Sequence, residues 1–206
     1  MKTWDAFFRD VMPMVRGCPE PMAEHALLRA AQRFLRQTRT WMVDLQPVQT
    51  IPGLIDYDIE LETNSELVRL EGAMLDGRPI DVTVEEAVAP NYRALPTGMQ
   101  ECIFTVDQKT LIVLPARLEA HQLRVKASLT LSERALGVED FIFDQHVRKI
   151  ALGAVADLMQ QPGMPYTAAA QGMLLDKQFQ VAMNTIAHNR SRGFSSARPR
   201  RQVNTF

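Results

Sequence analysis

The residue types that most often carry out chemistry are scattered along this chain. Its four histidines lie far apart, and none belongs to a metal-binding spacing such as His-Glu-x-x-His. The two cysteines, Cys18 and Cys102, form no Cys-x-x-Cys pair. Neither a zinc site nor a disulfide framework is therefore predicted, and this cysteine usage is typical of a reducing compartment. We expect the protein to hold no metal and no other cofactor.

The local arrangement Asp144-Gln145-His146 is the one that most resembles an acid–base site. Because neighbouring positions on a helix point in different directions, we interpret it as an exposed helix face. The glycines form neither a dinucleotide-binding nor a phosphate-binding loop motif, and no Gly-x-Ser-x-Gly nucleophile motif is present. The chain is therefore predicted not to be an enzyme, although a site assembled from distant residues would leave no such signature.

The C-terminal segment has the most distinctive composition. From Lys177 to Phe206 there are six basic residues and no acidic one, whereas the other 176 residues carry 17 basic and 24 acidic residues. Three interpretations remain open: a solvated terminus, an arm that contacts nucleic-acid phosphates, and a tail that docks on a protein. The aromatic terminus after the arginines favours protein docking, in which arginines bind acidic groups and apolar side chains enter pockets. The predicted docking residues are Arg190, Arg192, Phe194, Arg198, Arg200, Arg201, Val203 and Phe206.

Hydrophobic periodicity divides the rest of the chain into three parts. Apolar residues recur with helical spacing before Pro47 and again after Gly137, whereas apolar and polar residues alternate between them, most regularly from Leu123 to Leu131. Asp76-Gly77 predicts a tight hairpin turn. No apolar run approaches the roughly 18 residues that cross a bilayer, so we expect a soluble protein without a membrane partner.

These patterns predict an α+β fold, in which N- and C-terminal helices form a helical bundle with an inserted antiparallel β-rich subdomain. The expected parts are residues 1–46 for the N-terminal helices, 47–132 for the β-rich subdomain and 133–189 for the C-terminal helices. Residues 190–206 are expected to be a flexible basic docking tail, because the segment has too little apolar surface to offset its ordering entropy.

Several short segments recur in a fixed order along the chain. They are residues 8–19, 26–35 with Trp41, 110–115, 123–129, 151–159 and 162–166, followed by Phe179 and the basic tail to Phe206. This ordered series resembles the head–tail connector, or neck adaptor, proteins of tailed bacteriophages, and the similarity extends over nearly the full length. Two positions depart from it: Tyr166 stands where tryptophan is usual, and Leu35 stands where cysteine is frequent.

The resemblance implies a structural protein of the virion neck, assembled in the host cytoplasm. It implies a homo-oligomeric ring of about twelve subunits that docks on the phage portal protein through residues 190–206. A downstream tail or nozzle protein would bind the ring, and DNA would pass through its channel with transient contact. Other neck components, such as a stopper or tail terminator, and a DNA-binding protein using the basic arm remain the alternatives.

Overall fold

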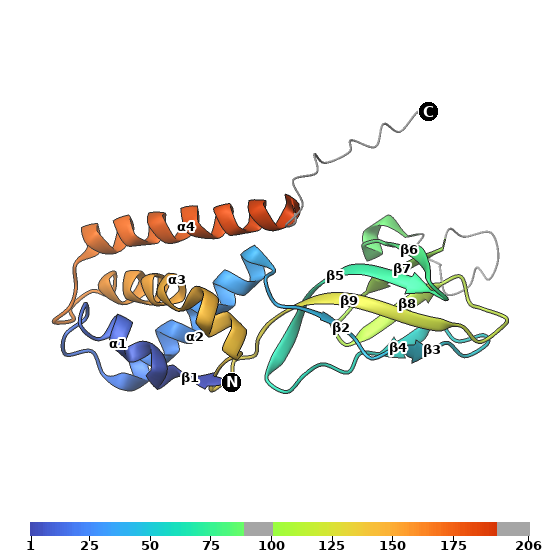
Figure 1. Ribbon diagram of the computed structural model, residues 1–206, viewed down its shortest axis with the longest axis horizontal. Helices are drawn as coiled ribbons and strands as arrows, with labels where there is room; N and C mark the ends of the chain where they lie inside the picture. The colour runs from blue at the N-terminus through green and yellow to red at the C-terminus, as the bar shows by residue number, and fades with distance from the viewer. Residues whose placement is uncertain (89–100, 193–206) are drawn as a thin grey trace, which may run out of the picture. The chain divides into compact units, whose positions relative to one another are not determined.

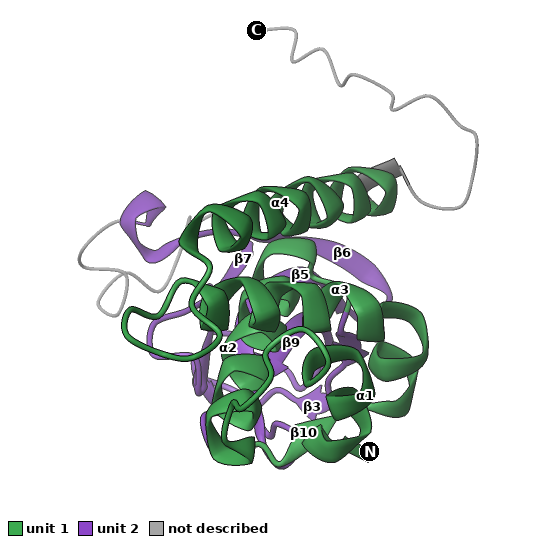
Figure 2. Ribbon diagram, turned by 90° about the vertical axis from the view of Figure 1, so that its left-hand side faces the viewer, with its two compact units in different colours: residues 1–40, 135–206 green, residues 41–134 purple. Residues whose placement is uncertain are grey.

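The computed structural model describes residues 1–88 and 101–192, the last two of these through their backbone only. The chain divides into two compact units, which Figure 2 colours separately. Unit 1 comprises residues 1–40 and 135–206, and unit 2 comprises residues 41–134. No helix in the described part of the chain is long and apolar enough to span a membrane.

Unit 1 is built mainly from helices. The short helices η1 (Trp4–Phe7) and α1 (Phe8–Val11) precede α2 (Glu20–Thr38), and α3 (Asp140–Met159) is followed by α4 (Ala169–Arg192). The three long helices contact one another, as Figure 1 shows. Unit 1 also contains a two-stranded antiparallel sheet, in which β1 (Lys2–Thr3) pairs with β10 (Gly137–Val138).

The core of unit 1 follows from the apolar stripes of the long helices. On α2, alanines alternate with larger side chains such as Leu27 and Phe34, all of them buried. Phe34 stacks on Phe179 of α4, with 6.4 Å between the ring centroids.

The α2 helix ends where Arg39 adopts a left-handed conformation, with φ of 51°, and its N–H bonds to the Leu35 carbonyl.

Unit 2 contains all the remaining strands that the structure describes. They form one curled eight-stranded sheet in the order β2-β9-β5-β6-β7-β8-β4, with β3 also paired to β9. A short 3₁₀ helix, η2 (Glu85–Ala87), follows β6. The strands are β2 (Met42–Asp44), β3 (Val48–Gln49), β4 (Asp56–Asp58), β5 (Ser65–Leu75), β6 (Arg78–Val82), β7 (Cys102–Thr105), β8 (Thr110–Leu114) and β9 (Gln122–Leu131).

Two predicted features of this sheet are confirmed. Along β9, Leu123 and Val125 are buried between exposed residues, as expected for a strand that covers a core with one face, whereas from Ala127 to Leu131 both faces are buried. The hairpin between β5 and β6 turns at Asp76-Gly77, where both residues have positive φ, 47° and 79°. Such a turn matches the right-handed twist of the flanking strands.

The predicted architecture, a helical bundle with an antiparallel β-rich insertion, is wrong, although the class is α+β. The large curled sheet is mixed, because β6 and β7 pair in parallel, with Asp81 opposite Cys102 and Val82 opposite Ile103. Unit 1 is not a bundle of helices alone, since β1 and β10 pair within it. Parallel neighbours need a connection of about a dozen residues or more, and residues 83–101 between β6 and β7 are long enough to supply one. The strand pattern misled because this stretch carries no helix-length apolar stripe in the sequence.

Candidate docking site at the C-terminal end of α4

The C-terminal end of α4 is attached to α2 through polar side chains. The Arg190 guanidinium donates a hydrogen bond to the Thr38 carbonyl over 3.2 Å. This carbonyl lies in the last turn of α2, where unsatisfied carbonyls carry partial negative charge and favour a cation. Two further contacts join the same helices earlier along their length: Arg33 to Asp176, and Gln37 to Asn184 at 2.7 Å.

Of the eight predicted docking residues, two lie on α4. The helix continues through Arg192, so Arg190 and Arg192 are helical, three residues into the range expected as a tail. Arg190 is already engaged with α2, and only the backbone of Arg192 is described. The other six, Phe194, Arg198, Arg200, Arg201, Val203 and Phe206, lie outside the described residues.

A pocket of about 630 Å³ lies beside this helix end, within unit 1; we call it the end pocket. Ile186, Asn189 and Arg190 line it from α4, and Phe141 and His146 line it from α3. Thr40 and Gln145 complete the lining. Phe141 is 42% exposed, so the pocket offers an aromatic wall that the described residues leave partly uncovered.

His146 occupies a different environment from the one expected. Its ring packs against Phe34, with the centroids 4.8 Å apart, and burial together with the charge of Lys149 lowers its pKa to about 4. The interpretation of this residue as part of an exposed face is therefore wrong, although Asp144 and Gln145 are exposed. A neutral imidazole on an aromatic ring acts as a packing group at neutral pH.

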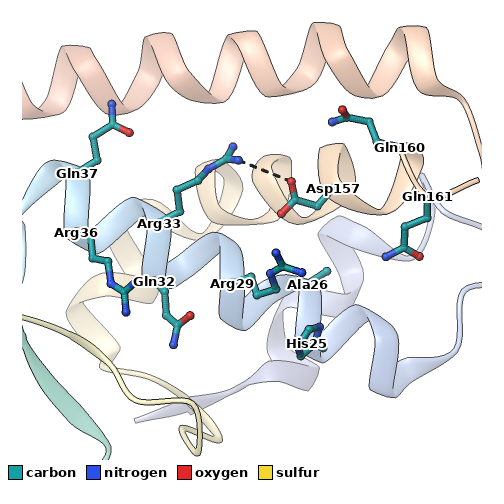
Figure 3. A pocket seen from close by; sticks show the side chains of 10 residues that line it. All are labelled: His25, Ala26, Arg29, Gln32, Arg33, Arg36, Gln37, Asp157, Gln160 and Gln161. Carbon is teal, nitrogen blue, oxygen red and sulfur yellow. Dashed lines mark ion pairs between the residues drawn. The ribbon is translucent and has the colours of Figure 1, made fainter.

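A second hollow, a groove of about 770 Å³, runs along the outer face of α2 towards the end of α3. Figure 3 shows arginine and glutamine side chains along it, with Arg33 directed towards Asp157. Helical spacing places Arg29, Arg33 and Arg36 on one side of α2. Such a row of guanidinium groups could bind an acidic ligand if its charges were available.

The central arginine of the groove is committed to the fold. Arg33 forms ion pairs with Asp157, at 3.8 Å, and with Asp176, and its guanidinium lies 4.7 Å from the centroid of the Phe179 ring. Burial raises the pKa of Asp157, although the charge of Arg33 opposes the shift. This network joins α2, α3 and α4, so we assign it to helix attachment and not to ligand binding.

No protein-family model matches the chain, and no curated protein matches it either.

Unit 2 contains one close acid–imidazole pair. Nδ1 of His121 lies 2.6 Å from Asp76, whose other carboxylate oxygen accepts a hydrogen bond from the Gln122 N–H. These bonds, that of His121 first, lower the pKa of Asp76. They link the β5–β6 turn to the start of β9.

Burial raises the pKa of the Cys102 thiol, which disfavours the nucleophilic thiolate. Within residues 1–88 and 101–192 no group of three or more histidine, cysteine, aspartate or glutamate side chains could hold a metal ion.

The sequence analysis missed these contacts for a common reason. Arg33 and Asp176 are 143 residues apart, and Asp76 and His121 are 45 residues apart. No motif spacing relates residues at such separations, and a single sequence carries no signal that joins them. A charged residue at the edge of a helical apolar stripe, as Arg33 is, was the only available hint.

Proposed function

We propose that this protein is a non-catalytic structural adaptor of the neck of a tailed bacteriophage. Copies assemble into a ring, the C-terminal segment binds the portal protein, and a downstream tail or nozzle protein binds the ring while DNA passes through. The observation that carries the proposal is the end of α4. This helix is tied to α2 by Arg190 and is followed in the sequence by a basic segment that contains Phe194 and Phe206.

A fixed helix end followed by a segment of low apolar content suits docking on a partner. A segment of this composition gains little from burying its own side chains, so binding it to a partner carries an entropic cost that keeps the affinity of a single copy low. In a ring, several such segments bind at once, so weak single contacts add up to a stable complex. Premature attachment of single copies is thereby disfavoured.

The charge distribution supports passage of DNA without tight binding. Residues 41–134, which form unit 2, contain 15 acidic and 8 basic residues, whereas residues 1–40 and 135–192 contain 9 acidic and 12 basic residues. The negative charge is thus concentrated on the sheet unit. An acidic surface repels phosphates, so a channel bordered by unit 2 would let DNA slide.

Ring formation would use the outer face of α4. Met173, Leu174 and Val181 on this face are 65%, 56% and 58% exposed. Their spacing of seven and eight residues places them on one side of the helix. Large apolar side chains grouped on one helix face commonly mark a protein contact, and the proposal assigns this one to a second copy of the chain.

The proposal is tested by mixing the full chain, or a variant lacking residues 193–206, with the portal protein encoded in the same genome. The full chain is expected to co-sediment with portal rings and to add a layer to them in negative-stain images. The truncated variant, which keeps residues Ala169–Arg192 of α4, is expected to stay folded but unattached. Attachment of the truncated variant would overturn the docking role.

A parallel experiment with a 30-base-pair DNA duplex distinguishes the adaptor proposal from the DNA-binding alternative. If the protein is an adaptor, we expect it to have little affinity for the duplex at 150 mM salt. A DNA-binding arm would instead give tight binding that falls steeply with salt and disappears with the truncation. Tight binding of that kind without attachment to the portal protein would replace the adaptor proposal.

A further inference from the structure

The groove along α2 keeps two exposed arginines beside the one that the fold uses. Arg29 and Arg36 line the groove on either side of Arg33, and both are exposed. Arg33 turns towards Asp157, whereas Arg36 points away from that pair (Figure 3). Arg36 follows Arg29 by two helical turns, so the two lie on one side of α2 and about 10 Å apart. The groove therefore suits a ligand with several negative charges at a similar spacing.

Unit 2 carries a row of negative charge with such a spacing. Asp58, which ends β4, and the following Glu60 and Glu62 are exposed, whereas Ile59 and Leu61 between them are only partly exposed. This alternation places the three carboxylates, which we call the acidic row, on one side of an extended segment. Alternate residues of extended backbone lie roughly 7 Å apart, so the row spans about 13 Å.

The acidic row borders a cleft that suits an arginine side chain. Asp58 and Glu60 line this cleft of about 280 Å³ within unit 2. The rest of its lining is mostly apolar and includes Leu45, Leu111 and Val125. An arginine has an apolar stem and a charged head that forms paired hydrogen bonds with carboxylates, so it matches both parts of the lining.

We propose that the acidic row of one copy binds the α2 groove of the next copy in the ring, with an arginine of the groove entering the cleft beside the row. The inference rests on the proposed self-assembly, for which it names a polar contact between subunits. Because the groove belongs to unit 1 and the row to unit 2, each copy contributes two different surfaces. Such a head-to-tail contact gives a ring when its rotation closes, whereas a contact between identical surfaces ends at a dimer.

The groove suits protein carboxylates better than the phosphates of a nucleic acid. Asp157 lines it opposite Arg33, between the two exposed arginines, and disfavours a continuous line of negative charge such as a DNA strand. Gln32 and Gln160 also line the groove. Their amides can both donate to and accept from a peptide main chain, which a row of phosphates does not require.

Charge exchange between the two surfaces tests the contact. The groove variant carries Arg29→Glu and Arg36→Glu, and the row variant carries Asp58→Lys, Glu60→Lys and Glu62→Lys. All five positions are exposed, so both variants should fold, which circular dichroism checks. In sedimentation velocity each variant alone should need at least about tenfold more protein than the parent for half-assembly. An equimolar mixture should assemble like the parent, because each reversed surface then meets its reversed counterpart.

The matched control is Arg16→Glu with Arg148→Glu, which reverses two exposed arginines of unit 1 outside the groove and gives the same net charge as the groove variant. It should assemble like the parent. Assembly of the parent should also weaken as salt rises from about 50 mM to about 500 mM, because exposed charges are then screened. This second measurement needs no substitution, so it does not depend on how the variants fold.

The outcomes separate this contact from the proposed function. The contact is wrong, although the ring stands, if either variant alone assembles like the parent, if the mixture assembles no better than its components, or if salt has no effect. A parent chain that never assembles would overturn both the contact and the ring. If the groove variant assembles normally but loses binding to a 30-base-pair DNA duplex that the parent binds, the groove is a phosphate site and the contact is refuted.

Discussion

The ring of Phe179 on α4 lies directly against the backbone of Gly153 on α3. A methyl group placed on Gly153 would be 2.5 Å from Cε1 of that ring, closer than real carbon atoms approach. Glycine weakens a helix interior by about 1 kcal/mol relative to alanine. The close approach of α4 to α3 requires glycine at position 153 in spite of this lower helix propensity. Phe179 in turn stacks on Phe34 and contacts Arg33.

Gly153→Ala should therefore destabilise the protein in spite of the better helix propensity of alanine. We expect the free energy of unfolding to fall by about 1–3 kcal/mol, the usual cost of overpacking a core. Urea denaturation followed by circular dichroism measures it. Phe179→Leu makes room for the methyl group, so the double variant should lose less than the sum of the two single losses. Simple additivity would show that the two residues do not interact in this way.

Arg33→Ala should also destabilise the protein, because it leaves Asp157 and Asp176 without their shared cation. Breaking a buried ion pair costs about 3–5 kcal/mol, but the Arg33 side chain is 35% exposed, so we expect about 1–2 kcal/mol. Arg16→Ala is the matched control, since Arg16 is exposed, and its effect should stay within about 0.5 kcal/mol. An equal effect of the two substitutions would contradict the assigned role of Arg33.

His146 predicts a stability loss on acidification. Its pKa is about 4 in the folded protein against 6.5 for the ordinary group, so between these values the unfolded chain binds a proton that the folded chain does not. Stability should fall as the pH drops from about 6.5 to about 4, and this residue should add nothing further below that. Denaturation at a series of pH values measures the slope. His146→Phe should flatten it, and His25→Gln, at an exposed position, should not; identical slopes in all three proteins would refute the prediction.

Leu174→Glu should prevent ring formation without unfolding the subunit. The side chain is 56% exposed, so a carboxylate there stays hydrated in the monomer but would be desolvated in an apolar contact between copies. Sedimentation velocity should show rings for the parent chain and monomers for the variant. Val106→Glu, at a 50% exposed position of unit 2, is the control and should leave assembly intact. Rings formed by Leu174→Glu would remove α4 from the subunit contact.

The C-terminal segment remains a prediction from composition and resemblance. Arg198, Arg200, Arg201 and Phe206 lie outside the described residues, whereas Arg190 and Arg192 lie on α4 and Arg190 binds the Thr38 carbonyl. The excess of basic residues in the sequence indicated that residues 190–206 differ from the rest of the chain. It gave no sign that Arg190 belongs to the packing of α4 on α2, because the partner atom is a main-chain carbonyl 152 residues away.

Features set by neighbours in the chain could be predicted from the sequence. The alternation along β9, the Asp76-Gly77 turn and the buried stripe of α2 each follow from the steric preferences or side-chain period of a few consecutive residues. Only the tertiary structure decided that β6 lies parallel to β7, that Arg33 meets Asp176 and that His146 is sheltered by Phe34. These three contacts depend on which surfaces from distant parts of the chain meet. The folded arrangement minimises exposed apolar area and unpaired polar groups over the whole chain, and a local sequence pattern cannot show which arrangement does so.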